Sequence, residues 1–80
     1  MTGWMVFELS ESEDGEGGVE HSDVFLNRED AVKEFNSMVN EEKSEKICKS
    51  CKVESESARL HVGECYVHIW IEEVEINGGD

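Results

Sequence analysis

Two cysteines three positions apart are the clearest chemical signal in the sequence. Cys48 and Cys51 form a C-x-x-C pair in the segment KICKSCK, and His61 and Cys65 are the candidates that would complete a metal site. A structural zinc site uses four such ligands in tetrahedral geometry and often begins with this pair. The predicted strands argue against the set, because only a break near residues 55–57 would bring Cys51 and Cys65 together. We therefore predict no metal and no cofactor, and a zinc-stabilised structural domain is the alternative.

The many carboxylates do not predict catalysis. Acid–base chemistry needs two carboxylates in different environments, at least one of them partly shielded from water. The glutamates of the C-terminal third all lie in strongly polar sequence, no Ser/His/Asp or Cys/His set stands out, and ESEDGEGG lacks the spacing of a calcium loop. We therefore predict that the protein is not an enzyme.

Aromatic residues in the segment YVHIWI predict a surface for a protein partner. In a strand, Tyr66 and Trp70 project on the face opposite Val67 and Ile69. With one helix covering the aliphatic face, the aromatic face would be open, and Trp and Tyr often dominate the binding energy of interfaces. We predict partner binding by these two aromatic residues together with a rim of carboxylates, namely Glu54, Glu56, Glu72, Glu73 and Glu75.

The net charge indicates the kind of partner. Twenty acidic residues against seven basic ones give −13, a charge that repels nucleic-acid phosphates and anionic membranes and attracts basic surfaces. The sequence therefore predicts a non-enzymatic protein-binding module, in its sharpest form an acidic inhibitor or nucleic-acid mimic that occupies a basic surface of a partner protein, without direct nucleic-acid or membrane binding. The alternatives are a homodimer with stacked sheets and acidity that serves only solubility.

The helix is predicted at residues 28–43. Asn27 stands at the position of an N-cap. The apolar residues that follow recur at the spacing of one helical face, at Ala31, Val32, Phe35, Met38 and Val39. Two strands are predicted before the helix, at residues 3–10 and 19–26, and residues 10–18 are predicted to be a flexible, acidic, glycine-rich loop.

A hairpin is predicted after the helix. Residues 58–62 and 65–71 would pair across a turn at Gly63–Glu64, with Leu60 opposite Val67. Continued in this register, the hairpin sets Cys51 opposite Ile76 and Glu54 opposite Glu73. Facing carboxylates are destabilising, and the apolar positions change parity after Ile71, so a one-residue bulge near Glu72–Glu73 is predicted to turn Val74 and Ile76 inward.

These elements give an α+β fold in a single small acidic domain, residues 1–80. About four strands in the order β-β-α-β-β would form a small antiparallel sheet with one helix packed on one face, and residues 77–80 would be a frayed tail. We expect no signal peptide and no membrane span. The odd number of cysteines, three, favours a reducing, cytoplasmic location.

Overall fold

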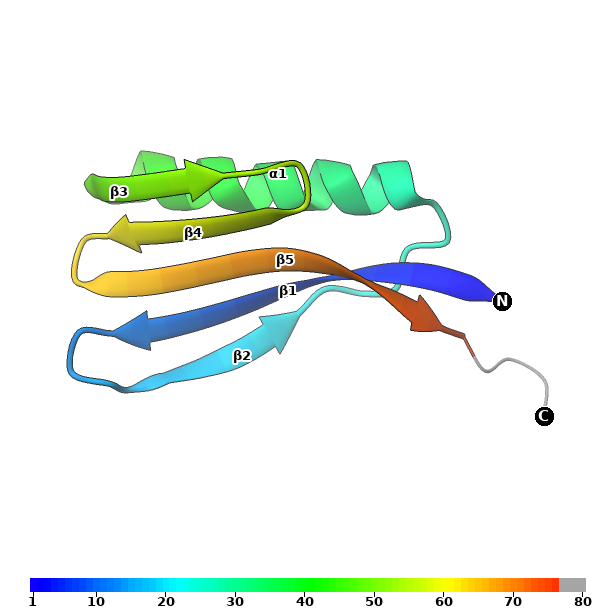
Figure 1. Ribbon diagram of the computed structural model, residues 1–80, viewed down its shortest axis with the longest axis horizontal. Helices are drawn as coiled ribbons and strands as arrows, with labels where there is room; N and C mark the ends of the chain where they lie inside the picture. Colours follow the sequence, from blue (N-terminus) through cyan, green and yellow to red (C-terminus); the bar gives the residue numbers. More distant parts are fainter. Residues whose placement is uncertain (77–80) are drawn as a thin grey trace.

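A computed structural model describes residues 1–76 and shows one helix on one face of a five-stranded antiparallel sheet (Figure 1). The sheet order is β2-β1-β5-β4-β3. The α+β class, the single helix and the antiparallel sheet are confirmed, whereas the count of about four strands is one too low. The elements are β1 (Thr2–Ser12), β2 (Gly17–His21), α1 (Arg28–Glu45), β3 (Cys48–Val53), β4 (Ser57–Val62) and β5 (Cys65–Glu75).

Helix α1 begins where its capping residue predicts. The side chain of Asn27 accepts a hydrogen bond of 2.9 Å from the backbone N–H of Glu29, which satisfies one of the free donors of the first turn. The helix buries Ala31, Phe35 and Val39 against the sheet. They join a core whose other buried members come from the strands, namely Val6, Ala58, Leu60, Val62, Val67 and Ile69.

The β4–β5 hairpin has the predicted register. Val62 pairs with Cys65 and Leu60 with Val67. Gly63 in the turn has a φ of 58°, a left-handed conformation that glycine adopts without steric cost. The burial alternates along both strands, so that the aliphatic side chains face the helix.

The missed strand is β3. It pairs antiparallel with β4, with Cys51 opposite Leu60 rather than Ile76. The chain reverses at Glu54–Glu56, where the backbone N–H of Glu54 donates to the carbonyl of Ser57 over 2.7 Å. The strand therefore does break near residues 55–57. Because of this break, Glu54 does not pair with Glu73.

The predicted bulge in β5 is wrong. The pairing of β1 with β5 runs without a shift from Thr2–Glu75 to Ser12–Cys65. Val74 therefore stays on the same face as Trp70. Gly3, opposite Val74, leaves room for the side chains of Val24 and Ile76, because a Cβ at this position would lie 2.6 Å from Val24 Cγ1 and 2.7 Å from Ile76 Cδ1.

The N-terminal hairpin is longer than predicted, and its loop is shorter. Strand β1 extends to Ser12 and β2 begins at Gly17, so much of the predicted 10–18 loop is paired backbone. Strand β2 ends at His21, so the predicted strand at 19–26 forms only in part. Beyond it, the backbone N–H of Ser22 donates to the carbonyl of Val6, and an isolated bridge pairs Trp4 with Phe25. The predicted tail at 77–80 lies outside the described residues. Within residues 1–76, no helical segment combines the length and apolar character of a membrane span.

Candidate functional site

A single helix cannot cover all five strands, and this leaves two exposed surfaces. Helix α1 packs against β1, β5 and β4. On the helix side of the sheet, β2 therefore extends beyond the helix. The whole opposite side, which we call the open face, is free of any covering element among the described residues (Figure 1).

The first surface is a groove on the helix side, which we call the acidic groove. It has a volume of about 490 Å³ and is lined by residues of β1, the β1–β2 turn and β2, together with Glu42 of α1 and Cys65 of β5. Glu8 lies directly opposite Glu20 in the β1–β2 ladder, and facing like charges destabilise a sheet. The carboxylates that line the groove are Glu8, Glu16, Glu20 and Glu42.

The electrostatics of the groove are unfavourable as the chain stands. The pKa of Glu8 is raised above its ordinary value, first by burial and then by the neighbouring carboxylates of Glu42 and Glu20. Lys46 Nζ lies 3.3 Å from Oε2 of Glu42, which raises the pKa of Lys46. That oxygen is shielded from solvent, and Lys46 is its ion-pair partner. Lys46 supplies one positive charge against the four carboxylates that line the groove, which therefore keeps an excess of negative charge.

A partner's basic side chain suits this groove better than a bare metal ion. Within the described part of the chain, no three His, Cys, Asp or Glu side chains are placed to hold one metal. A guanidinium or ammonium group makes fewer geometric demands, because it spreads several N–H donors over separate carboxylates.

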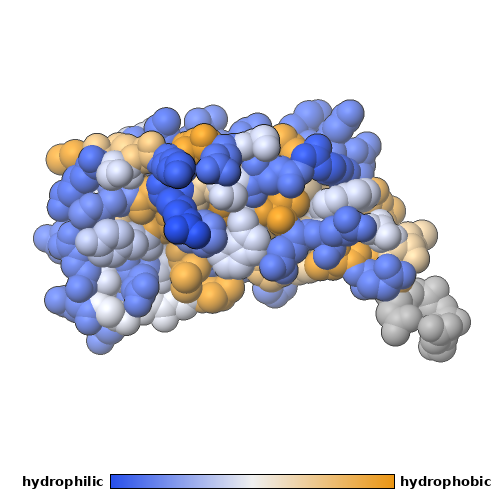
Figure 2. Space-filling view, in the orientation of Figure 1, coloured by the Kyte–Doolittle hydropathy of each residue, from blue (hydrophilic) through white to orange (hydrophobic). Residues whose placement is uncertain are grey.

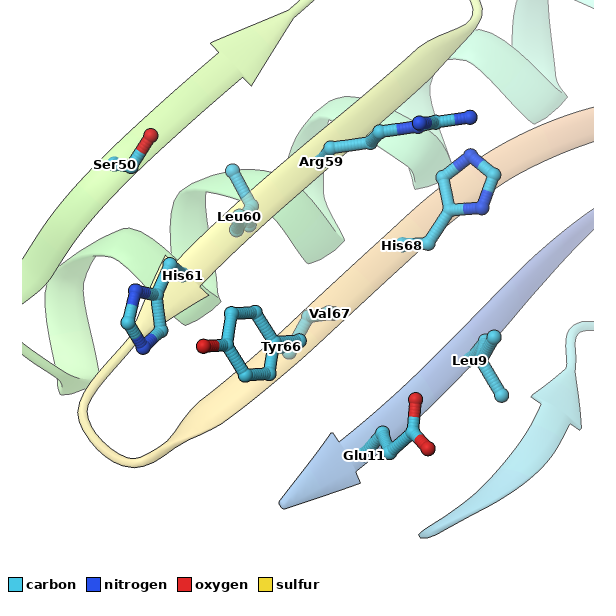
Figure 3. Close-up of a pocket in the computed structure, with 9 residues that line it drawn as sticks. All are labelled: Leu9, Glu11, Ser50, Arg59, Leu60, His61, Tyr66, Val67 and His68. Carbon is cyan, nitrogen blue, oxygen red and sulfur yellow. The ribbon is translucent and has the colours of Figure 1, made fainter. Parts of the chain in front are cut away.

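The second surface is the open face, which carries an aromatic row across three strands. The rings of Phe7 and Trp70 stack with centroids 5.5 Å apart, and His68 lies 4.7 Å from Trp70. His61 and Tyr66 stack at 4.3 Å. Figure 3 shows the side chains that share this side of the sheet, which include His61, Tyr66, His68, Arg59 and Glu11. In the same view, Leu60 and Val67 are directed towards the helix. Tyr66 is 50% exposed.

Opposite charges are balanced on the open face. Strand alternation and pairing place Arg59 and Lys52 on it, and also Glu11 and Glu72. Figure 2 shows apolar and polar side chains interspersed over this side. The net charge of −13 therefore lies on the rest of the surface.

Two ionisable groups at the open face have shifted pKa values. The pKa of Glu13 is lowered by the imidazole of His61, whose Nε2 lies 2.9 Å from its Oε2, and by Lys49. The pKa of His68 is lowered by burial and by the charge of Arg59.

The seven residues predicted to bind a partner do not form one surface. Tyr66, Trp70 and Glu72 lie on the open face. Glu73 and Glu75 alternate to the helix side, where Glu75 pairs with the N-terminal amino group over 3.2 Å. The two remaining glutamates both precede β4. Glu56 forms an ion pair with Arg28, and Glu54 lies in the β3–β4 turn.

The candidate zinc ligands are not assembled either. The break before β4 does bring Cys48 and Cys65 to the same end of the sheet. Val62 of β4 lies between them, paired with Cys48 of β3 on one side and with Cys65 of β5 on the other. However, a disulfide joins Cys48 to Cys51. His61 projects from the open face, where it contacts Glu13 and Tyr66.

Sequence reasoning missed the acidic groove. Its signal was present in the segment WMVFELS, where Trp4, Val6 and Glu8 share one face of the strand. A carboxylate at an otherwise inward position indicates a partly buried charge, and such charges gather at functional sites. Glu42 carried no comparable signal, because it lies among other polar helix residues.

Comparison with protein-family models, with curated proteins and with solved structures finds no match to this chain. The functional proposal therefore depends on geometry and charge.

Proposed function

We propose that this chain is a non-enzymatic protein-binding module that takes a basic side chain of a partner protein into the acidic groove. The observation that carries the proposal is the carboxylate cluster of Glu8, Glu20 and Glu42, in which burial and then repulsion by the other two carboxylates raise the pKa of Glu8. A bound arginine or lysine would replace this repulsion with attraction. The attraction between opposite charges is stronger in a partly desolvated groove than at an open surface.

The remaining charge supports the same function from a distance. A net charge of −13 accelerates the approach of a basic partner and disfavours anionic ones. In its sharpest form the proposal describes an acidic inhibitor or nucleic-acid mimic that covers a basic surface, in the cytoplasm and without binding nucleic acid or membrane itself. In a reducing compartment the Cys48–Cys51 disulfide would open, and neither cysteine lines the groove.

Calorimetric titration with an arginine-rich peptide tests the proposal. We expect Glu42→Gln to weaken binding by about tenfold, equivalent to about 1.4 kcal/mol, because it removes a carboxylate from the groove. Glu54→Gln is the matched control, since it removes the same charge from the exposed β3–β4 turn and should change the affinity less than twofold.

The titration also distinguishes a site from diffuse attraction. Equal losses in the two variants would show that the peptide responds to net charge alone, and the groove would no longer be the binding site. A replacement of glutamate by glutamine keeps the side-chain volume, so a difference between the variants reports on charge at a position.

A further inference from the structure

We infer that the open face is the interface of a homodimer, in which a second copy of this chain stacks its own open face on the first. The inference goes beyond the acidic groove, which lies on the helix side and remains exposed in such a dimer. Its starting point is the aromatic row of Phe7, Trp70 and His68 on an uncovered sheet, a surface that solubility alone does not require.

The open face has the dimensions of a stable interface. The principal extents of the molecule are 44 × 24 × 17 Å, and the sheet spans the two larger ones (Figure 1). A standard protein interface takes about 800 Å² from each partner, which fits within this outline. Two such sheets pack with their strands about 30° apart and their backbones about 10 Å apart.

Charge selects a second copy as the occupant. Two chains of −13 each repel one another over most of their surfaces. On the open face, Arg59 and Lys52 offset Glu11 and Glu72. A self-complementary contact is therefore least opposed by charge at this face. A strongly basic partner, by contrast, gains most on the acidic helix side.

The placement of Arg59 and Glu11 also fits twofold symmetry. The basic residues lie on β3 and β4, and Glu11 lies on β1, with β5 between them. A twofold axis parallel to β5 turns the second sheet over, so that β4 of one copy lies above β1 of the other. Arg59 of each copy then lies within reach of Glu11 in its partner, and Trp70 and Tyr66 of both copies fill the centre.

Sedimentation equilibrium with charge-exchanged variants tests the dimer. Wild type should sediment with twice the chain mass. Arg59→Glu alone and Glu11→Lys alone each place like charges across the interface, so each should weaken association by at least tenfold. An equimolar mixture of the two variants restores both pairs and should recover the dimer as a heterodimer.

The mixture makes the test independent of folding, since a misfolded variant cannot be rescued by another misfolded variant. A wild-type monomer at the highest concentration would overturn the inference and leave the open face to a different partner. A dimer that is insensitive to both substitutions would place the interface elsewhere. Retained binding of the arginine-rich peptide by the monomeric variants would show that the groove acts independently of dimerisation.

Discussion

Neutralising Glu8 should stabilise the fold and weaken the binding of a basic ligand. Glu8 faces Glu20 across the β1–β2 ladder and lies beside Glu42, and its carboxylate is partly buried. The substitution Glu8→Gln removes this repulsion while it keeps the volume of the side chain. A residue whose removal makes the protein more stable but less able to bind is retained for binding rather than for folding.

The expected gain follows from the two neighbouring carboxylates. One unfavourable charge pair in a sheet costs roughly 0.2–1 kcal/mol. Glu8 faces one such partner, Glu20, and lies near a second carboxylate, that of Glu42 on α1. We therefore expect the free energy of unfolding to rise by about 1 kcal/mol at pH 7. For a domain of this size, such a gain raises the melting temperature by about 4–8 °C.

The pH dependence of stability separately tests whether the Glu8 carboxylate destabilises the fold. Because the pKa of Glu8 is raised above 4.5 in the folded chain, the native state holds this proton more tightly than the unfolded state. The destabilisation by Glu8 is therefore absent below pH 4.5 and grows as the pH rises through the folded pKa. The advantage of Glu8→Gln should appear at neutral pH and vanish in acid.

Thermal unfolding at several pH values, with peptide titration at pH 7, measures both effects. Glu54→Gln serves again as the control of equal charge, and should change neither stability nor affinity appreciably. If Glu8→Gln were less stable than wild type at pH 7, or equally stabilised at all pH values, the repulsion argument for the groove would be refuted.

Four further predictions concern the framework of the fold. Phe35→Ala, at a fully buried core position, should cost about 3–5 kcal/mol in urea denaturation. Gly17→Ala should weaken the β1–β2 hairpin, seen as faster amide exchange in both strands, because its Cβ would fall on the Ser10 carbonyl. The Cys48–Cys51 disulfide closes a loop with a sequence separation of only three residues. Its reduction should therefore lower stability by about 2 kcal/mol at most. A chelator added to reduced protein should leave the melting temperature unchanged. A lower melting temperature would instead support the alternative of a zinc-stabilised domain.

The elements that could be predicted from the sequence are those with local signals. The stripe from Ala31 to Val39 and the cap at Asn27 fix the helix, and Gly63 fixes the β4–β5 turn. Strand β3 lacks such a signal: its segment CKSCKV is polar, and its residues are largely exposed at the sheet edge. Its strand conformation comes from pairing with β4, a long-range contact that periodicity does not encode.

The same limit applies to the functional surfaces. Alternation within β5 was enough to place Tyr66 and Trp70 on an open face. It could not show that Glu73 and Glu75 leave that face, because this follows from an unbroken pairing with β1. The acidic groove also depends on a long-range contact, since Glu8 and Glu42 are brought together only by the packing of α1 on β1.

The width of the sheet explains why both surfaces exist. Strands lie about 4.8 Å apart, so five strands span roughly twice the diameter of one helix, about 10–12 Å. Helix α1 covers β1, β5 and β4, and the two edge strands extend beyond it. At the β2 edge this overhang gathers carboxylates into a groove. On the other side of the sheet no second helix hides the aromatic row. A chain of this size with one helix therefore leaves a charged groove and a separate, charge-balanced face, the two surfaces on which the proposed basic ligand and the proposed second copy would bind.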